Sequence, residues 1–279
     1  MNPVEQLNLT IWSWIEAFRS VRRRIYFIPL LVYLGTEALL FVWLWNFSHP
    51  AVSWFMAPLM KASFGLDALH YPANFLVFPE LFGRMDIVLG LVWGSLLFGV
   101  ATYLFARGFG GEELRLGQAF SRAARCYPKL LLSQIPGTVL AVGILFLAER
   151  HIGGGEALPG NTVRLFRYGG LLLATVVQAL FAFAMVLIVF EGAGLARALG
   201  QSVRLAGRNA IGAFLLVGVP MMLHYPTSLI LRRAPLLVER GAPEVLAVVA
   251  GGDVLIGLVS NYLFLAGITR FYLASRRAG

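Results

Sequence analysis

Six long apolar stretches, separated by more polar segments, set the hydrophobic pattern of this chain. A bilayer core about 30 Å thick is crossed by about 20 apolar residues in a helix, and each stretch is close to that length. We therefore expect an all-α integral membrane protein with six transmembrane helices. In the fifth stretch, Pro220 and Pro226 are expected to loosen or kink the helix. The predicted spans are residues 26–47, 85–106, 130–148, 168–190, 210–231 and 248–272.

A short amphipathic pattern precedes three of these spans and suggests an internal repeat. Each copy contains a Glu or Gln followed seven positions later by an arginine, and an apolar helix begins shortly afterwards. At helical spacing, apolar side chains fall on one side of each segment and arginines on the other. This is typical of a helix that lies along the cytoplasmic membrane surface. The three segments are residues 14–18, 116–120 and 199–203.

The repeat predicts both the domain organisation and a set of lipid contacts. We expect one membrane domain, 1–279, built from three two-helix units at approximately 11–107, 112–190 and 192–275, each preceded by its interfacial helix. An arginine near the membrane surface attracts anionic lipid headgroups by on the order of 1 kcal/mol. Membrane lipids that are anionic on the cytoplasmic face are therefore expected partners. The predicted headgroup contacts are Arg19, Arg23, Arg122, Arg125, Arg204 and Arg208.

The segment 48–84, between the first two predicted spans, is rich in aromatic residues and prolines. A freely solvated loop would carry fewer aromatic side chains. We expect this segment to lie in the outer interface, as one or two short amphipathic helices or as a shallow re-entrant segment. Two interpretations stay open, a cap that lies on the membrane and a lid or partner-docking surface.

Charge and composition place the chain in a membrane and orient it there. The chain is 58% hydrophobic and 13% charged, with mean hydropathy +0.76, whereas soluble domains have about 25% charged residues. With the N-terminus inside, the inner segments hold 15 Lys and Arg and the outer segments hold 8, which predicts that both termini are cytoplasmic. The basic residues are 21 Arg and two Lys, a bias typical of a GC-rich bacterial genome, so we expect a multi-pass protein of the bacterial inner membrane.

Two further totals exclude whole classes of function. The net charge is +9, but no basic module is separable from the apolar stretches, so nucleic acid is not an expected partner. The single cysteine, Cys126, excludes an intrachain disulfide and any Cys-based metal cluster.

Five polar residues fall inside predicted spans and are the candidate binding residues. Ionisable groups in the membrane cost a few kcal/mol and usually face a helix bundle or a cavity. One interpretation is a site at which Glu37 binds a proton or cation, lined by the side chains of Gln178, His224 and Asn261. The other is that these groups hold the helices together by hydrogen bonds across the bundle. The five residues are Glu37, Gln178, His224, Asp253 and Asn261.

Catalytic chemistry has little support in the sequence. No metalloprotease, nucleophile-elbow, P-loop or dinucleotide motif occurs. His49, His70 and His151 fall on the predicted outer side with Glu149 nearby. They are either a metal site assembled in space or unrelated loop histidines. We predict no catalytic residue, no metal site and no cofactor.

The third predicted unit carries a family resemblance over about 20 residues. An acidic residue, Glu191, ends a span, an Ala-Leu-x-x-Ser-x-x-Leu helix follows at 198–205, and the pair Arg208-Asn209 precedes the next span. This pattern resembles poorly characterised six-span bacterial membrane proteins, among them the membrane domain of glycerophosphoryl diester phosphodiesterases. The resemblance implies a fold rather than an activity, because the phosphodiesterase domain itself is absent.

We expect a non-enzymatic membrane protein that takes part in lipid or small-solute handling, or that is a subunit of a larger membrane complex with a protein partner. One alternative is a membrane-embedded enzyme that acts on a lipid. Another is a permease-like subunit of an ATP-driven transporter. The coupling loop of such permeases is only partly matched at residues 191–200, where Gly200 comes nine positions after Glu191 and the terminal Leu-Pro is missing.

Overall fold

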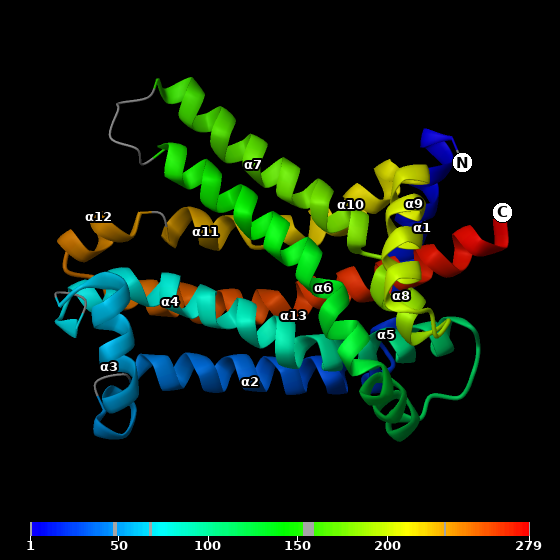
Figure 1. Cartoon of the computed structure of the whole chain (residues 1–279), viewed down its shortest axis with the longest axis horizontal. Helices are drawn as coiled ribbons and strands as arrows, with labels where there is room; N and C mark the ends of the chain where they lie inside the picture. Colours follow the sequence, from blue (N-terminus) through cyan, green and yellow to red (C-terminus); the bar gives the residue numbers. More distant parts are fainter. Residues whose placement is uncertain (1, 47–48, 67–68, 153–158, 232, 279) are drawn as a thin grey trace. The chain divides into compact units, whose positions relative to one another are not determined.

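The computed structural model describes residues 2–46, 49–66, 69–152, 159–231 and 233–278. In these ranges all the regular elements are helices (Figure 1). Residues 48, 67 and 68 of the predicted outer segment lie outside the described part. In chain order the elements are α1 Pro3–Ser20, η1 Arg24–Tyr26, α2 Phe27–Trp45, α3 Pro50–Phe64, α4 Ala73–Leu89, the π-helical turn η3 Gly90–Gly94, α5 Ser95–Phe109, α6 Leu116–Ile152, α7 Gly160–Phe181, α8 Ala184–Val189, α9 Leu195–Arg208, α10 Ala210–Met222, α11 Tyr225–Leu231, α12 Ala234–Glu239 and α13 Glu244–Ala278.

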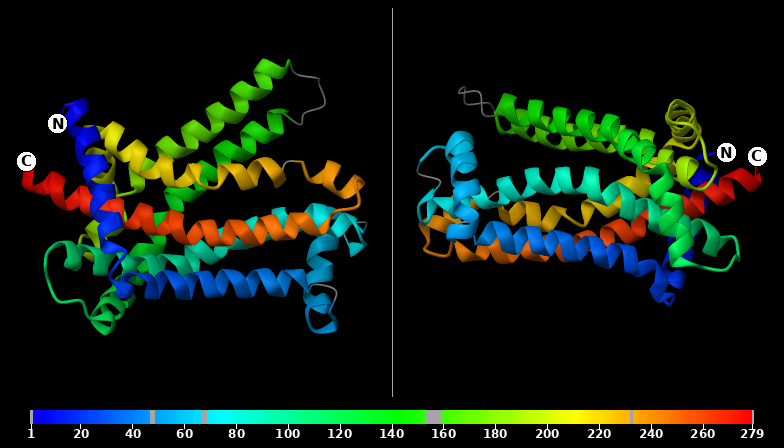
Figure 2. Two further views of the ribbon diagram at one scale, coloured as in Figure 1. Left: turned by 180° about the vertical axis from the view of Figure 1, so that it is seen from behind. Right: turned by 60° about the horizontal axis from the view of Figure 1, so that its bottom comes forward.

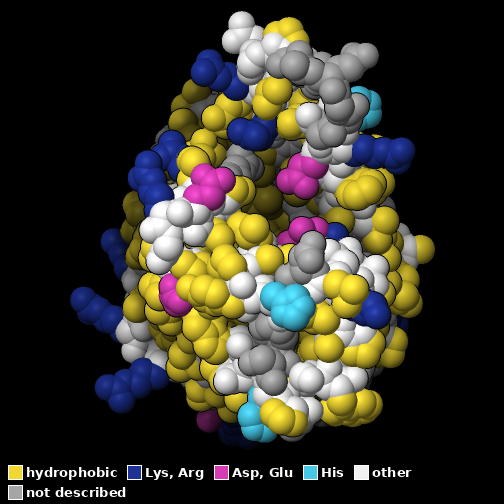
Figure 3. All heavy atoms as spheres, turned by 90° about the vertical axis from the view of Figure 1, so that its left-hand side faces the viewer, with side chains coloured by type: hydrophobic (Ala, Val, Ile, Leu, Met, Phe, Trp, Pro, Cys, Tyr) yellow, Lys and Arg dark blue, Asp and Glu magenta, His cyan; other side chains and the backbone are white. Residues whose placement is uncertain are grey.

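Five helical stretches of the described chain are long and apolar enough to cross a membrane. A sixth is obtained if α9 and α10, which meet at an angle of 101°, are counted as one bent span. The prediction of an all-helical protein with several apolar spans is thus confirmed. Large apolar side chains such as Leu39, Phe146 and Leu255 lie exposed on these helices, and apolar side chains make up much of the face seen in Figure 3. The five stretches are Arg24–Trp45, Ala73–Phe109, Leu116–Ile152, Gly160–Val189 and Glu244–Arg276.

The fifth predicted span, 210–231, differs from a continuous helix. Its first part is α10, only 13 residues long, and the chain leaves the helix at Leu223 and His224 before α11 begins. Pro226 explains the break, because proline has no N–H to donate and its ring collides with the carbonyl group of the residue four positions earlier.

The helices form two compact units. Unit 1 comprises residues 1–29, 95–220 and 262–279, and unit 2 comprises 30–94 and 221–261. The boundaries fall within α2, α10 and α13 and between η3 and α5. The single domain and the three repeat units, which divide the chain differently, stay predictions.

Unit 1 is built around α8, in which every residue is buried. This short helix contacts α5, α6 and α9, while α6 and α7 run side by side as an antiparallel pair (Figures 1 and 2). Gln6 attaches α1 to the junction of α9 and α10: its Nε2 donates to the carbonyl oxygen of Arg208, and its Oε1 accepts from the N–H of Ile211, both at 3.2 Å. The start of α1 and the end of α13, both in unit 1, lie near each other in Figures 1 and 2.

Unit 2 contains the aromatic segment predicted as an outer loop. Most of that segment is helical, as α3 and the first part of α4. Met56 and Phe78 of these helices are buried together with Leu44 of α2 and Ala250 of α13. Helix α4 begins at Ala73, twelve residues before the predicted start of the second span, and it accommodates Pro79 internally. The two interpretations of segment 48–84, a lid and a membrane-lying cap, both stay predictions.

The three predicted interfacial segments take different forms. The first lies in α1 and the third in α9, which are separate helices, whereas residues 116–120 open the 37-residue helix α6 without an interruption. Helix α9 buries Ala198 and Ser202 and exposes Arg204 and Arg208. A position of these helices along the membrane surface stays a prediction. Because the second copy is continuous with its span, the structural repeat stays a prediction.

Candidate functional site: a buried polar cluster in unit 2

Glu37 lies in the middle of α2 and only 6% of its surface is exposed. Its Oε2 is buried and has no hydrogen-bond partner among the described residues. Tyr33, one turn earlier on the same helix face, is 4% exposed and contacts the same carboxyl group. A buried polar atom without a partner costs free energy in a fold, so the free oxygen of Glu37 marks a place where a ligand proton or donor would be stabilising.

Asp86 of α4 brings a second carboxyl group to Glu37. The Tyr33 hydroxyl lies 3.5 Å from Oδ1 of Asp86, and the two carboxyl groups interact directly. Asp86 lies one turn before Gly90, where the π-helical turn η3 begins. A Cβ atom at Gly90 would lie 3.2 Å from the Tyr33 hydroxyl oxygen. The missing side chain at Gly90 thus leaves the space that this hydroxyl occupies.

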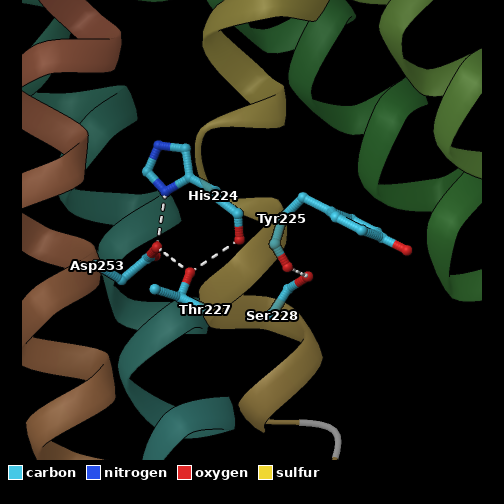
Figure 4. Close-up of polar contacts among 5 residues, drawn as sticks. All are labelled: His224, Tyr225, Thr227, Ser228 and Asp253. Atoms are coloured by element: carbon cyan, nitrogen blue, oxygen red, sulfur yellow. Dashed lines mark hydrogen bonds and ion pairs between the residues drawn. The ribbon is translucent and has the colours of Figure 1, made fainter.

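A third group of polar side chains comes from the break between α10 and α11 (Figure 4). Nδ1 of His224 lies 2.9 Å from Oδ1 of Asp253 on α13, and the contact is an ion pair when the imidazole is protonated. The Thr227 hydroxyl lies within hydrogen-bond distance of the same carboxylate and of the His224 carbonyl oxygen. Tyr225 points away from Asp253 in this view. The imidazole is thereby held in place by a carboxylate at its Nδ1 side.

Gly257, one turn after Asp253 on α13, joins the three groups into one cluster. A Cβ atom there would lie 3.9 Å from Cε1 of His224 and 4.0 Å from the unpaired Oε2 of Glu37. The imidazole and the free carboxyl oxygen therefore face the same point of α13. Glu37 also interacts electrostatically with Asp253, and Asp86 with His224.

Burial differs sharply across this cluster. The His224 and Asp253 side chains are 36% and 32% exposed, whereas Glu37 is almost wholly buried. A proton bound by the partly exposed His224–Asp253 pair would lie next to the buried carboxyl group of Glu37. The arrangement suits reversible proton or small-cation binding.

The structure brings together three of the five predicted intramembrane residues: Glu37, His224 and Asp253. Gln178 belongs to unit 1, where its Oε1 lies near Gly137 of α6. Asn261 is eight residues after Asp253 on α13, which separates the two by about 12 Å along the helix axis.

Sequence reasoning missed Tyr33, Asp86 and Thr227. Two of these carried a signal, since Tyr33 and Glu37 are four residues apart and His224 and Thr227 three apart, spacings that share a helix face. Asp86 is the second residue of the predicted second span, where an ionisable group is expected at the membrane boundary, whereas the helix extends back to Ala73.

The predicted headgroup arginines have varied surroundings. Arg19 pairs with Glu16 at 2.9 Å, and Arg125 bonds to Ser121 on its own helix. Nε of Arg122 donates to the carbonyl oxygen of Val189 at 2.9 Å, which satisfies a carbonyl group at the end of α8. The remaining three, Arg23, Arg204 and Arg208, are exposed.

Within the described residues, no three His, Cys, Asp or Glu side chains are arranged to hold a metal ion. His151, one of the outer candidates, bonds through Nδ1 to the carbonyl oxygen of Leu147 on its own helix and stacks on Phe166. Comparison with protein-family models, curated proteins and solved structures finds no match to this chain. The function proposed below is therefore inferred from the polar cluster of unit 2.

Proposed function

We propose that this chain is a non-enzymatic, multi-pass protein of the bacterial inner membrane that moves a small solute, with proton binding at the Glu37 cluster as the coupling step. The unpaired, buried oxygen of Glu37 beside two further carboxyl groups carries this proposal. The cluster consists of Glu37, Asp86, Asp253 and His224, with Tyr33 and Thr227 as hydrogen-bonding neighbours.

Proton binding follows from the number of like charges. Three carboxyl groups close together repel one another when ionised, and low-dielectric surroundings make each further charge more costly. A protonated His224 would offset one of these charges. A proton bound at Glu37 would remove another and would give the unpaired Oε2 a hydrogen.

The helix geometry around the cluster supports movement. Discontinuous helices place binding sites for substrates and coupling ions in many transporters, and here His224 lies in the break between α10 and α11. Asp86 precedes the π-helical turn η3, a type of irregularity frequent at functional sites. Backbone hydrogen bonding is already irregular beside these two residues. A conformational change that follows protonation there would therefore break few regular helical hydrogen bonds.

The first test measures proton binding directly. Infrared difference spectra between acidic and alkaline pH report protonated carboxyl groups, and we expect a band in the wild-type protein that is lost in Glu37→Gln. Glu80→Gln is the matched control, because Glu80 is an exposed carboxylate of α4 paired with Arg84. An unchanged band in Glu37→Gln would refute proton binding at this residue.

The second test measures coupling. In proteoliposomes on a solid-supported membrane, a panel of small solutes is expected to yield a current that requires a proton gradient and disappears in Glu37→Gln. A current that follows a sodium gradient instead would replace the proton with Na⁺. A solute current that persists in Glu37→Gln without any gradient would contradict the coupling role.

One observation favours a second candidate, an enzyme that acts on a lipid. An imidazole oriented by a carboxylate is the usual arrangement of a general base, and the His224–Asp253 pair is partly exposed. Incubation with a bacterial lipid extract, followed by lipid mass spectrometry, tests this alternative. A product made by the wild type and absent with His224→Gln would favour the enzyme, and unchanged lipids would exclude it under those conditions.

A further inference from the structure

A pocket of about 510 Å³ is lined by residues of unit 1, whereas the residues of the polar cluster belong to unit 2. Its walls come from the end of α8 and the following turn, from α9, and from the last turns of α13. Three arginines and one carboxylate line it: Arg204, Arg208, Arg276 and Glu191.

The carboxylate of this pocket is already paired. Glu191 lies 2.9 Å from Nη1 of Arg276 and also accepts a hydrogen bond from the Tyr272 hydroxyl. Arg204 and Arg208, four residues apart on α9, lie on the same face of that helix. Within the described residues neither guanidinium has a carboxylate within ion-pair distance. The pocket therefore carries two uncompensated positive charges side by side.

A further polar atom of the lining lacks a partner. Oε1 of Gln201, one turn before Arg204 and Leu205, is buried and makes no hydrogen bond among the described residues. Gln201 therefore offers an unused hydrogen-bond acceptor. A ligand bearing a hydroxyl or amino group next to its anionic group would satisfy it.

The position of α9 indicates where such a ligand would come from. Helix α10 is almost wholly apolar, and α9 meets it at 101°. If the axis of α10 runs along the bilayer normal, α9 lies nearly in the membrane plane, with its buried face formed by Ala198, Ser202 and Ala206. Arginines on the other face of such a helix lie at the depth of lipid phosphates.

We propose that this pocket binds the phosphate group of an anionic phosphate ester, either a phospholipid headgroup or a soluble phosphate ester. Guanidinium groups bind phosphate through paired hydrogen bonds, and Arg204 and Arg208 supply two of them. Gln201 bonds to a polar substituent beside the phosphate. The ion pair of Glu191 with Arg276 closes the opposite wall and keeps the carboxylate from repelling the anion.

Native mass spectrometry of the full chain in mild detergent tests binding of the lipid. Dioleoyl phosphatidylglycerol is the anionic probe and dioleoyl phosphatidylcholine the zwitterionic comparison. We expect retention of phosphatidylglycerol by the wild type. The double variant Arg204→Gln, Arg208→Gln should bind it roughly tenfold or more weakly, because the charged hydrogen bonds of two guanidinium groups to the phosphate are lost. Arg197→Gln is the matched control, because Arg197 is exposed on α9 but does not line the pocket.

Isothermal titration with sn-glycerol 3-phosphate and with inorganic phosphate distinguishes the two sources. Binding of sn-glycerol 3-phosphate that is lost in the double variant assigns a soluble ester, whereas binding of phosphatidylglycerol alone assigns a lipid. If neither probe binds, or if the double variant and Arg197→Gln weaken binding equally, the proposal is overturned. Circular dichroism of each variant shows whether it is folded. A second double variant, Arg204→Lys with Arg208→Lys, keeps both charges and so separates lost binding from lost folding.

Discussion

Individual glycines decide how closely side chains approach one another in both units. At Gly257 a Cβ atom would meet only ordinary contacts near 4 Å, and the space beside it is shared by His224 and Glu37. At Gly212 of α10 there is no such space, because a Cβ atom would lie 2.7 Å from the buried ring of Phe271 and 3.1 Å from Oγ1 of Thr10. The same residue type thus keeps room for chemistry at one position and allows tight packing at the other.

The tight approach at Gly212 yields a stability prediction. We expect Gly212→Ala to lower the free energy of unfolding by about 1–3 kcal/mol, since overpacking a close-packed core forces side chains off their preferred positions. Thermal unfolding in detergent, followed by circular dichroism, measures the change.

Gly200→Ala is the control for that variant. Gly200 lies exposed in α9 with nothing within 4 Å of a Cβ atom, so alanine should stabilise the helix by up to about 1 kcal/mol. Equal effects of the two substitutions would show that contact with Phe271 is not the cause.

At the scale of elements, the breaks in the helices matter as much as the helices. Helix α7 stops at Phe181 and α8 starts at Ala184, and Ser202 of α9 covers the gap. The Ser202 hydroxyl donates to the carbonyl oxygen of Leu180 at 2.8 Å and accepts from the N–H of Phe183 at 3.1 Å. One buried side chain therefore satisfies two backbone groups that the break leaves open.

Removing that hydroxyl tests its contribution to the unit. Ser202→Ala is expected to destabilise the protein by about 1–3 kcal/mol, because it leaves a buried N–H and a buried carbonyl group unsatisfied. Ser133→Ala is matched to it: Ser133 is also buried, but its hydroxyl donates only to the Leu130 carbonyl of its own helix. Urea or thermal unfolding measures the free energy of unfolding of both variants. Equal losses in the two would contradict the bridging role of Ser202.

At the scale of the whole molecule, the arginine distribution predicts the orientation in the membrane. Cys126 is buried, so a chain with Cys126→Ala and one new exposed cysteine reports the side on which that position lies. His151→Cys and Arg240→Cys are expected to react with a membrane-impermeant maleimide in intact cells. Asn2→Cys and Glu113→Cys should react only after the inner membrane is opened, since Lys and Arg are enriched in cytoplasmic segments.

The reverse labelling pattern would contradict this orientation. Labelling of position 2 and position 240 from the same side would contradict an odd number of crossings between them. All four residues are exposed on the described chain, so a negative result cannot arise from burial of the thiol within the protein.

The sequence by itself determined the class of protein and most of its helices. The length of an apolar stretch depends only on neighbouring residues in the chain, so the long apolar helices follow from the sequence directly. The same reasoning selected Glu37, His224 and Asp253, because an ionisable side chain in an apolar helix stands out without any knowledge of its neighbours.

Only the tertiary structure decided which of these groups meet. The pairing of Glu37 with Asp86 depends on the rotation of α2 and α4 about their axes, and hydropathy does not encode that rotation when helices are apolar all round. The separation of Gln178 into unit 1 likewise follows from packing between residues far apart in the chain. Local composition therefore determines that polar groups lie among these helices, and non-local packing determines which of them form a site.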